Sequence, residues 1–159
     1  MKYLLILLGG GAGSLARYLA GSAIAGRLGA RFPVGTMVVN VTGCFLIGLI
    51  MTLLTERQPH PYWRLALVVG FLGGYTTFSS FEWETYSAVR EGGFWIGLAN
   101  VVGSVGLGYA AVWLGALLAR RKLSSIFSSS SPAPAPPARW LRRSVSPGPR
   151  VYRRGPCLD

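Results

Sequence analysis

Four long apolar stretches dominate the sequence, and short polar segments separate them. The stretches cover about residues 3–26, 34–55, 62–89 and 94–119. A helix that crosses the lipid core needs roughly 20 mainly apolar residues, so each stretch predicts one transmembrane helix. Because the connecting segments are short, we expect consecutive helices to run antiparallel. The fold class that this pattern predicts is an all-α membrane protein with four spanning helices.

The first stretch also has the outline of a secretory signal peptide, with Lys2 ahead of an apolar run. Apolar character resumes after Arg17 and continues to Ala25, which favours a spanning helix instead. Aromatic rings favour the headgroup level of a bilayer. Such residues open the third and fourth stretches, and they are Tyr62, Trp63, Phe94 and Trp95.

Charge is scarce in this chain and unevenly placed. Only 13% of the residues are charged, against about 25% in an ordinary soluble domain. The net charge of +11 is of the kind seen in nucleic-acid-binding proteins. However, the basic residues lie mainly at the ends of apolar stretches or in the last part of the chain, where lipid headgroups or solvent surround them. We therefore expect no nucleic-acid partner.

The last segment, residues 123–159, differs in kind from the helical domain over residues 1–122. It contains a run of serines, the sequence PAPAPP and several arginines. Such a composition buries too little apolar surface to offset the entropy of ordering. We expect a disordered basic tail, which either rests on anionic lipid or has no function.

The basic residues of the helical domain favour one orientation in the membrane. One side carries the termini and the loop at 56–61, and it has more basic residues than the other side. They are Lys2, Arg57, Arg64, Arg120, Arg121 and Lys122, against Arg27, Arg31 and Arg90. The positive-inside rule then places the termini in the cytoplasm of a bacterial plasma membrane.

Two glycines and an arginine recur at helical spacing inside the first stretch. Gly9, Gly13 and Arg17 are four residues apart and share one face. Small residues at this spacing let helices pack closely in lipid, and we interpret the glycines in that way. A charged side chain inside a span faces protein or water. Arg17 is therefore either part of an ion pair or, as we favour, at a wet vestibule where it attracts an anion.

The second and fourth stretches carry polar faces of their own. Thr36, Asn40 and Gly43 share a face of the second helix. Asn40 either hydrogen-bonds a neighbouring helix or donates its amide to a passing anion, and the sequence favours neither. Asn100 and Ser104 lie four residues apart in the fourth helix. They line a polar track or, as their spacing alone favours, make interhelical hydrogen bonds.

The sharpest signal is the segment GFLGGYTTFSSFEWE in the third stretch. Glycine and β-branched threonine both disfavour a helix interior, so we expect the helix to break between Gly73 and Thr77. Unwound backbone at membrane depth requires surrounding protein or a water-filled cavity. The carbonyls that such a break frees can coordinate a cation.

Two phenylalanines follow the expected break. Phe78 and Phe81 are three residues apart and face the same way. Ring edges carry partial positive charge and can contact an anion, although a lipid-facing or core pair is the simpler interpretation. Thr77 and Ser80 supply hydroxyl donors, which either line the same path or bond to carbonyls of their own helix.

At these residues the chain resembles the Fluc (CrcB) family of fluoride channels. Three motifs match in order, namely GGGAGSLARY at 9–18, PVGTMVVNVTGCFLIG at 33–48 and the highly specific GFLGGYTTFSSF at 70–81. The resemblance covers about residues 1–122. It implies an antiparallel, dual-topology homodimer with two pores that exports cytoplasmic fluoride passively. It also leaves open a heterodimer of two paired gene products.

The resemblance further implies roles for individual residues. It places Arg17 at the vestibule, and it places the carbonyls of Gly73 and Thr76 around a structural Na⁺ at the dimer interface. The fluoride pore would be formed by Asn40, Thr77, Phe78, Ser80, Phe81, Glu84 and Ser104. Glu82 and the basic tail depart from the family pattern.

Three other functions are less consistent with these residues. A four-helix, proton-coupled drug exporter needs a carboxylate deep in the membrane, but the acids of the third stretch, Glu82 and Glu84, lie near its far end. A non-transporting scaffold would use the glycines for packing alone. Cys44, Cys157 and His60 form no metal-binding motif. Because no nucleophile–base pair is present either, we expect that the chain is not an enzyme.

Overall fold

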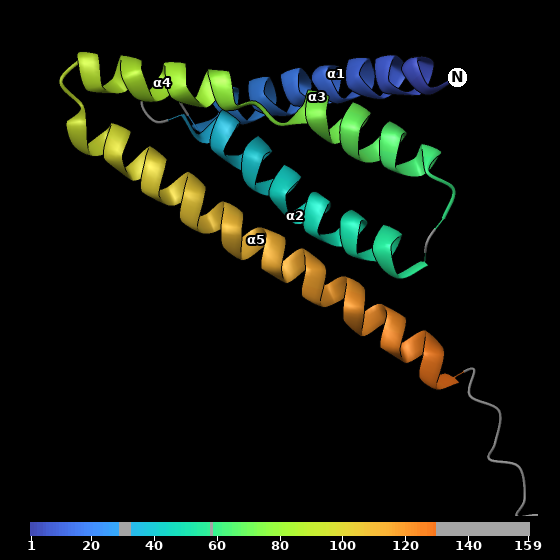
Figure 1. Cartoon of the computed structure of the whole chain (residues 1–159). Helices are drawn as coiled ribbons and strands as arrows, with labels where there is room; N and C mark the ends of the chain where they lie inside the picture. Colours follow the sequence, from blue (N-terminus) through green and yellow to red (C-terminus); the bar gives the residue numbers. More distant parts are fainter. Residues whose placement is uncertain (29–32, 58, 130–159) are drawn as a thin grey trace, which may run out of the picture. The chain divides into compact units, whose positions relative to one another are not determined.

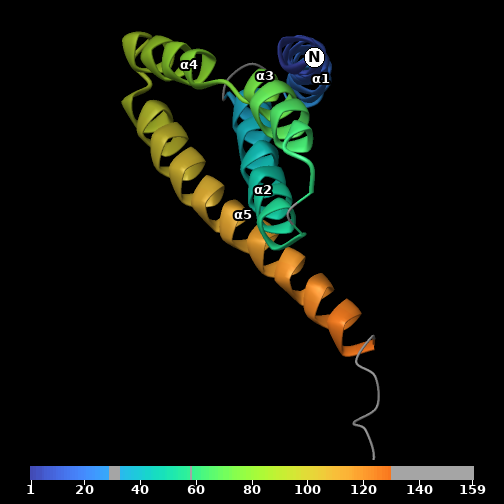
Figure 2. The same cartoon turned by 45° about the vertical axis from the view of Figure 1, so that its right-hand side comes forward.

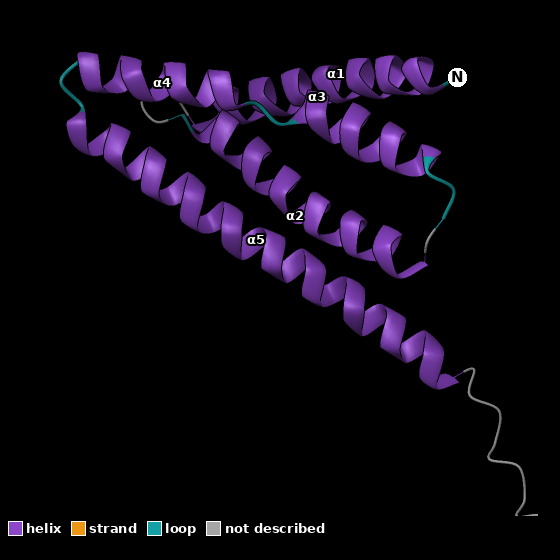
Figure 3. Ribbon diagram, in the orientation of Figure 1, coloured by secondary structure: helices purple, strands orange, loops and turns teal. Residues whose placement is uncertain are grey.

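The computed structural model describes residues 1–28, 33–57 and 59–129, and all regular structure in these ranges is helical. The elements, in chain order, are α1 (Lys2–Leu28), α2 (Val34–Arg57), the π-helix η1 (Arg64–Leu72), α3 (Gly73–Tyr75), α4 (Phe78–Arg90) and α5 (Phe94–Ser129). Figures 1 and 3 show this succession and the loops between the helices.

Three of the described helices, α1, α2 and α5, are long and apolar enough to cross a membrane. This confirms an all-helical membrane fold. The third predicted span is not one helix. It is divided among η1, α3 and α4, and the division falls between α3 and α4. Figure 3 shows the short loop that separates these two helices.

The interruption of the third span consists of two residues in extended conformation. Thr76 has φ −83° and ψ 154°, and Thr77 has φ −148° and ψ 118°. Gly73, in contrast, is helical with φ −63° and ψ −34°. The sequence therefore predicts a break correctly but starts it too early, because Gly73 and Gly74 still belong to α3.

Close packing against α1 explains why a glycine occupies a helical position before the break. A Cβ on Gly74 would overlap the backbone carbonyl of Gly10 on α1. A Cβ on Gly13 would likewise overlap the carbonyl of Phe71 in η1. Glycine at these positions therefore lets α1 lie directly against η1 and α3, which agrees with the packing role expected for the first-helix glycines.

The other long contact joins α2 and α5, the most extensive helix pair in the structure. Figures 1 and 2 both show α2 lying along α5. Here too glycines allow backbone contact, since a Cβ on Gly48 would overlap the Val112 carbonyl and one on Gly115 would overlap the Phe45 carbonyl. The turn between α4 and α5 uses Gly92 at φ 83°, and α4 also packs against α5.

The end of the last helix differs from the sequence expectation. The apolar stretch ends near residue 119, but α5 continues to Ser129. Residues 123–129, which the sequence assigned to the tail, are therefore helical. The disorder expected for residues 130–159 lies outside the described residues.

Candidate functional site

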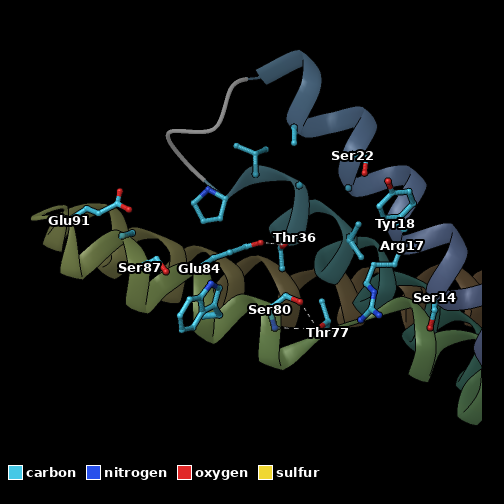
Figure 4. Close-up of a pocket in the computed structure, with 18 residues that line it drawn as sticks. Ser14, Arg17, Tyr18, Ser22, Thr36, Thr77, Ser80, Glu84, Ser87 and Glu91 are labelled. Carbon is cyan, nitrogen blue, oxygen red and sulfur yellow. Dashed lines mark hydrogen bonds between the residues drawn. The ribbon is translucent and has the colours of Figure 1, made fainter.

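Two cavities lie on either side of the extended threonines. The larger encloses about 680 Å³ between α1, α2 and α4, and its lining includes Arg17, Thr36, Thr77, Ser80 and Glu84 (Figure 4). The smaller encloses about 240 Å³, and its lining includes Asn40, Thr76, Thr77, Phe78, Phe81 and Ser104. Thr77 lines both cavities. The structure thus gathers the residues singled out in the sequence into two adjoining groups.

Asn40 on α2 makes two hydrogen bonds to the backbone at the break. Its Nδ2 donates to the Thr77 carbonyl at 2.9 Å, and its Oδ1 accepts from the Thr77 amide at 2.8 Å. Of the two interpretations of Asn40, the structure shows the hydrogen bond to a neighbouring segment. Asn40 nevertheless also lines the smaller cavity. Its amide has two N–H donors, so one remains available beyond the bond to Thr77.

Thr77 is also the N-cap of α4. Its Oγ1 accepts from the Ser80 amide at 3.3 Å and donates to the Ser80 hydroxyl at 3.1 Å. These bonds redirect two amides that a continuous helix would pair with carbonyls four residues earlier. The Thr77 amide goes to Asn40 instead of Gly73, and the Ser80 amide goes to Thr77 instead of Thr76. The carbonyls of Gly73 and Thr76 therefore lose their regular helical donors.

Phe78 and Phe81 contact each other and line the same cavity, as their spacing predicts. Their ring centroids are 5.8 Å apart, and the ring planes are tilted by 42°. Phe81 is only 6% exposed, whereas Phe78 is 74% exposed. One ring is thus buried by the fold of this chain, while the other lies on its surface.

The larger cavity carries the charged groups of the site. Glu84 Oε1 accepts from the Thr36 hydroxyl at 2.6 Å (Figure 4). Its Oε2 is buried and has no hydrogen-bond partner among the described residues. Arg17 extends from α1 and lines the same cavity (Figure 4). The three residues predicted to share the α2 face all contact the divided span. Thr36 bonds to Glu84, Asn40 bonds to Thr77, and Gly43 lies against the Thr76 methyl group.

A separate hydrogen-bonded group joins α4 to α5. Asn100 is 1% exposed, and its Nδ2 donates to Thr85 Oγ1 at 2.8 Å. The Ser104 hydroxyl reaches Asn100 Oδ1 at 3.4 Å. Asn100 therefore makes the interhelical bond that its spacing favours, while Ser104 also lines the smaller cavity.

Three residues that form hydrogen bonds between helices were not singled out from the sequence, namely Thr85, Thr42 and Tyr75. Thr85 follows Phe81 by four residues and shares its face, which is the signal that would have found it. Thr42 Oγ1 lies 2.9 Å from the Tyr75 hydroxyl. That contact joins two helices and has no signal in the local spacing.

Side-chain ligands for a metal are not grouped in this structure. Among the described residues, no three histidine, cysteine, aspartate or glutamate side chains lie close enough to hold an ion. A cation at this site would therefore depend on backbone carbonyls, of which those of Gly73 and Thr76 are relieved of their helical partners.

The sequence of this chain is similar to those of known proteins. A family model described as "CrcB-like protein, Camphor Resistance (CrcB)" matches residues 4–116. The chain belongs to this family. The match spans α1 to most of α5 and includes every residue of both cavities. Together with the three membrane-capable helices, it makes the chain a multi-pass membrane protein.

Several relatives carry the name fluoride-specific ion channel FluC. One from Solibacter usitatus is 87% identical over 122 residues, which are 76% of this chain and all of the relative. One from Acidobacterium capsulatum is 51% identical over 76% of this chain and 98% of the relative. One from Coxiella burnetii is 44% identical over 76% and 99% of the two chains.

Proposed function

We propose that this chain is a fluoride-selective ion channel through which cytoplasmic fluoride leaves the cell down its electrochemical gradient. The observation that carries the proposal is the break at Thr76 and Thr77. It brings Asn40, Phe78 and Phe81 to one cavity inside a protein whose relatives are named fluoride-specific channels. The CrcB-like family match supports the same function.

The ion path that we infer runs through both cavities. Arg17 in the larger cavity attracts the anion, and the hydroxyls of Thr77 and Ser80 offer hydrogen-bond donors further along. Thr77 lines both cavities and is the point at which the anion passes from one to the other. In the smaller cavity, the ring edges of Phe78 and Phe81 replace part of the hydration shell. Glu84 lines the entrance side of this path.

Passive export suits the chemistry of fluoride. Hydrogen fluoride enters a cell uncharged from acid surroundings and dissociates inside. A selective anion pore relieves the accumulation without an energy source. Selectivity would arise where donors and ring edges substitute for water in a narrow passage, which is the general basis of channel filters.

We further propose an antiparallel, dual-topology homodimer with two pores. The support is the exposure of Phe78 beside the smaller cavity, because a second copy would close the side that one subunit leaves open. A heterodimer with a paired gene product would close it in the same way. Chemical cross-linking of the purified chain, expressed alone, tests this: a homodimer gives a product of dimer mass, whereas a chain that needs a paired gene product stays at monomer mass.

A structural Na⁺ at the centre of that dimer fits the break. The carbonyls of Gly73 and Thr76 lack their regular helical donors, and carbonyl oxygen is a suitable ligand for a hard cation. When bound, Na⁺ would supply positive charge beside the anion path. Both residues come from the same break, so two copies would offer four such carbonyls.

Fluoride release from loaded liposomes tests the function. The purified chain should release fluoride, read with a fluoride electrode, while chloride-loaded vesicles lose little chloride. Phe81→Ile and Phe78→Ile should each slow fluoride release by about 2- to 10-fold and still run as the assembled species in size-exclusion chromatography. Phe94→Ile, at an exposed ring outside both cavities, is the matched control. Undiminished release from both variants would argue against ring-edge contacts.

A further inference from the structure

The end of α3 carries a hydrogen bond whose direction the structure settles. The hydroxyl of Thr42 donates to the carbonyls of its own helix, at 2.8 Å to Val38 and 2.9 Å to Val39. A threonine hydroxyl has one proton, so it has none left for Tyr75. The 2.9 Å contact between Thr42 Oγ1 and the Tyr75 hydroxyl therefore has Tyr75 as its donor.

The same turn of α2 contacts every residue of the break. Asn40 holds the amide and the carbonyl of Thr77. Gly43 lies so close to the Thr76 methyl group that a Cβ would overlap it. Thr42 accepts from Tyr75, the last residue of α3. One helical turn, residues 40–43, thus fixes three consecutive residues where the third span is divided.

The Tyr75 ring is held in place independently of its hydroxyl. It stacks on Phe71 with centroids 5.9 Å apart and planes 9° from parallel. The hydroxyl itself lies at the exposed side of α2, since Thr42 is exposed. Packing of the ring therefore needs only its apolar part, and the hydroxyl has a separate role.

We propose that Tyr75 and Thr42 are positioning residues of the pore. Their hydrogen bond fixes where α3 ends and so sets the direction of the Thr76 carbonyl and of the cavity-lining Thr77. The inference rests on the proposed fluoride channel, because it assigns the bond a role in conduction. It adds a second attachment of this segment to α2. Thr42 binds Tyr75 just before the break, and Asn40 binds Thr77 at its end.

Removal of either hydroxyl tests this assignment. Tyr75→Phe removes the donor and keeps the stacked ring, and Thr42→Val removes the acceptor and keeps the side-chain shape. Each should lower fluoride release from liposomes by about 2- to 10-fold, the effect of losing one net hydrogen bond. The double variant should lose no more than either single variant, because both remove the same bond. Thr42→Ser keeps the acceptor and should restore release.

A second readout separates positioning from mere stability. Hydrogen exchange of the amides at residues 76–80 should become faster in Tyr75→Phe, while exchange in α5 stays unchanged. The matched controls are Thr52→Val and Tyr109→Phe. Among the described residues, the Thr52 hydroxyl bonds only to the Gly48 carbonyl of its own helix, and the Tyr109 ring is exposed. Both controls should conduct like the wild type.

Each outcome decides the proposal. Additive losses in the double variant, unchanged release from both single variants, or equal losses in the controls would overturn the Tyr75–Thr42 assignment. So would a fall in release that merely follows a lower melting temperature without local change in exchange. Failure of the wild type to release fluoride would instead refute the proposed channel function, so the two failures are distinguishable.

Discussion

Two asparagines lie in apolar helices of this protein, and they bind different kinds of group. Asn40 on α2 bonds to the backbone amide and carbonyl of Thr77. Asn100 on α5 bonds to the side-chain hydroxyl of Thr85 and is almost fully buried. Both are asparagines on mainly apolar helices, so their residue type alone does not separate them.

The two asparagines differ in whether the group that each one binds has another hydrogen-bond partner. The Thr77 amide has no helical carbonyl to return to, because its φ and ψ are extended. Thr85, in contrast, keeps its own bond to the Phe81 carbonyl at 2.8 Å whether or not Asn100 is present. An asparagine that replaces missing helical bonds therefore shapes a site, whereas one that adds to complete bonds only joins two helices.

Replacement of Asn40 should lower fluoride release more than any other substitution considered. Asn40→Leu leaves an amide and a carbonyl of Thr77 without partners, and each such group costs about 1–3 kcal/mol. We expect fluoride release from liposomes to fall by about 100-fold or more. Asn40→Asp keeps the acceptor for the Thr77 amide but loses the donor for its carbonyl, so its loss should be intermediate. Wild-type release from Asn40→Leu would refute the assigned role.

An added methyl group at Gly43 should have the next largest effect. A Cβ there overlaps the Thr76 Cγ2 atom, and Thr76 cannot rotate freely because its hydroxyl donates to the Leu72 carbonyl at 3.0 Å. Overpacking of this kind costs about 1–3 kcal/mol, so Gly43→Ala should lower fluoride release by roughly tenfold.

The control for this variant is an equal change in open space. A Cβ on Gly11 meets no atom within 4 Å, so Gly11→Ala should release fluoride like the wild type. If both alanine variants lose the same activity, added helix propensity rather than the Thr76 contact is the cause.

The sequence predicts the long helices well and the break only in part. The spans of α1, α2 and α5 follow directly from apolar length, and the shared face of Thr36, Asn40 and Gly43 follows from helical spacing. Gly73 and Gly74 looked like helix breakers, but Gly74 is needed for close contact with Gly10. Local propensity could not show this, because the reason lies on another helix.

Partners across helices are the other part that the sequence does not show. The local sequence predicts neither the π-helical winding of η1 nor the bond of Tyr75 to Thr42, which joins two helices. The two Asn40 bonds to Thr77 join residues 37 positions apart. Helical spacing singles out Asn40, and the glycines and threonines predict the break, but only the folded chain puts the two together.

Replacement of Asn100 should affect fluoride release less than replacement of Asn40. Asn100→Leu removes the bond to Thr85 and the long contact with Ser104, and it leaves the Thr85 hydroxyl bonded to the Phe81 carbonyl. Side-chain hydrogen bonds between membrane helices average about 0.6 kcal/mol. We expect a lower melting temperature in detergent and fluoride release within about threefold of the wild type. A loss of release as large as that of Asn40→Leu would remove the distinction between the two asparagines.

Ser104 should show the smallest effect and also separates two roles within one residue. Its hydroxyl is 3.4 Å from Asn100 Oδ1, a long contact that contributes little to stability. The same residue lines the smaller cavity together with Phe78 and Phe81. Ser104→Ala should therefore leave the melting temperature unchanged and slow fluoride release by about twofold, as expected for one lost donor. If instead the melting temperature falls and release stays constant, Ser104 supports Asn100 and does not line the ion path.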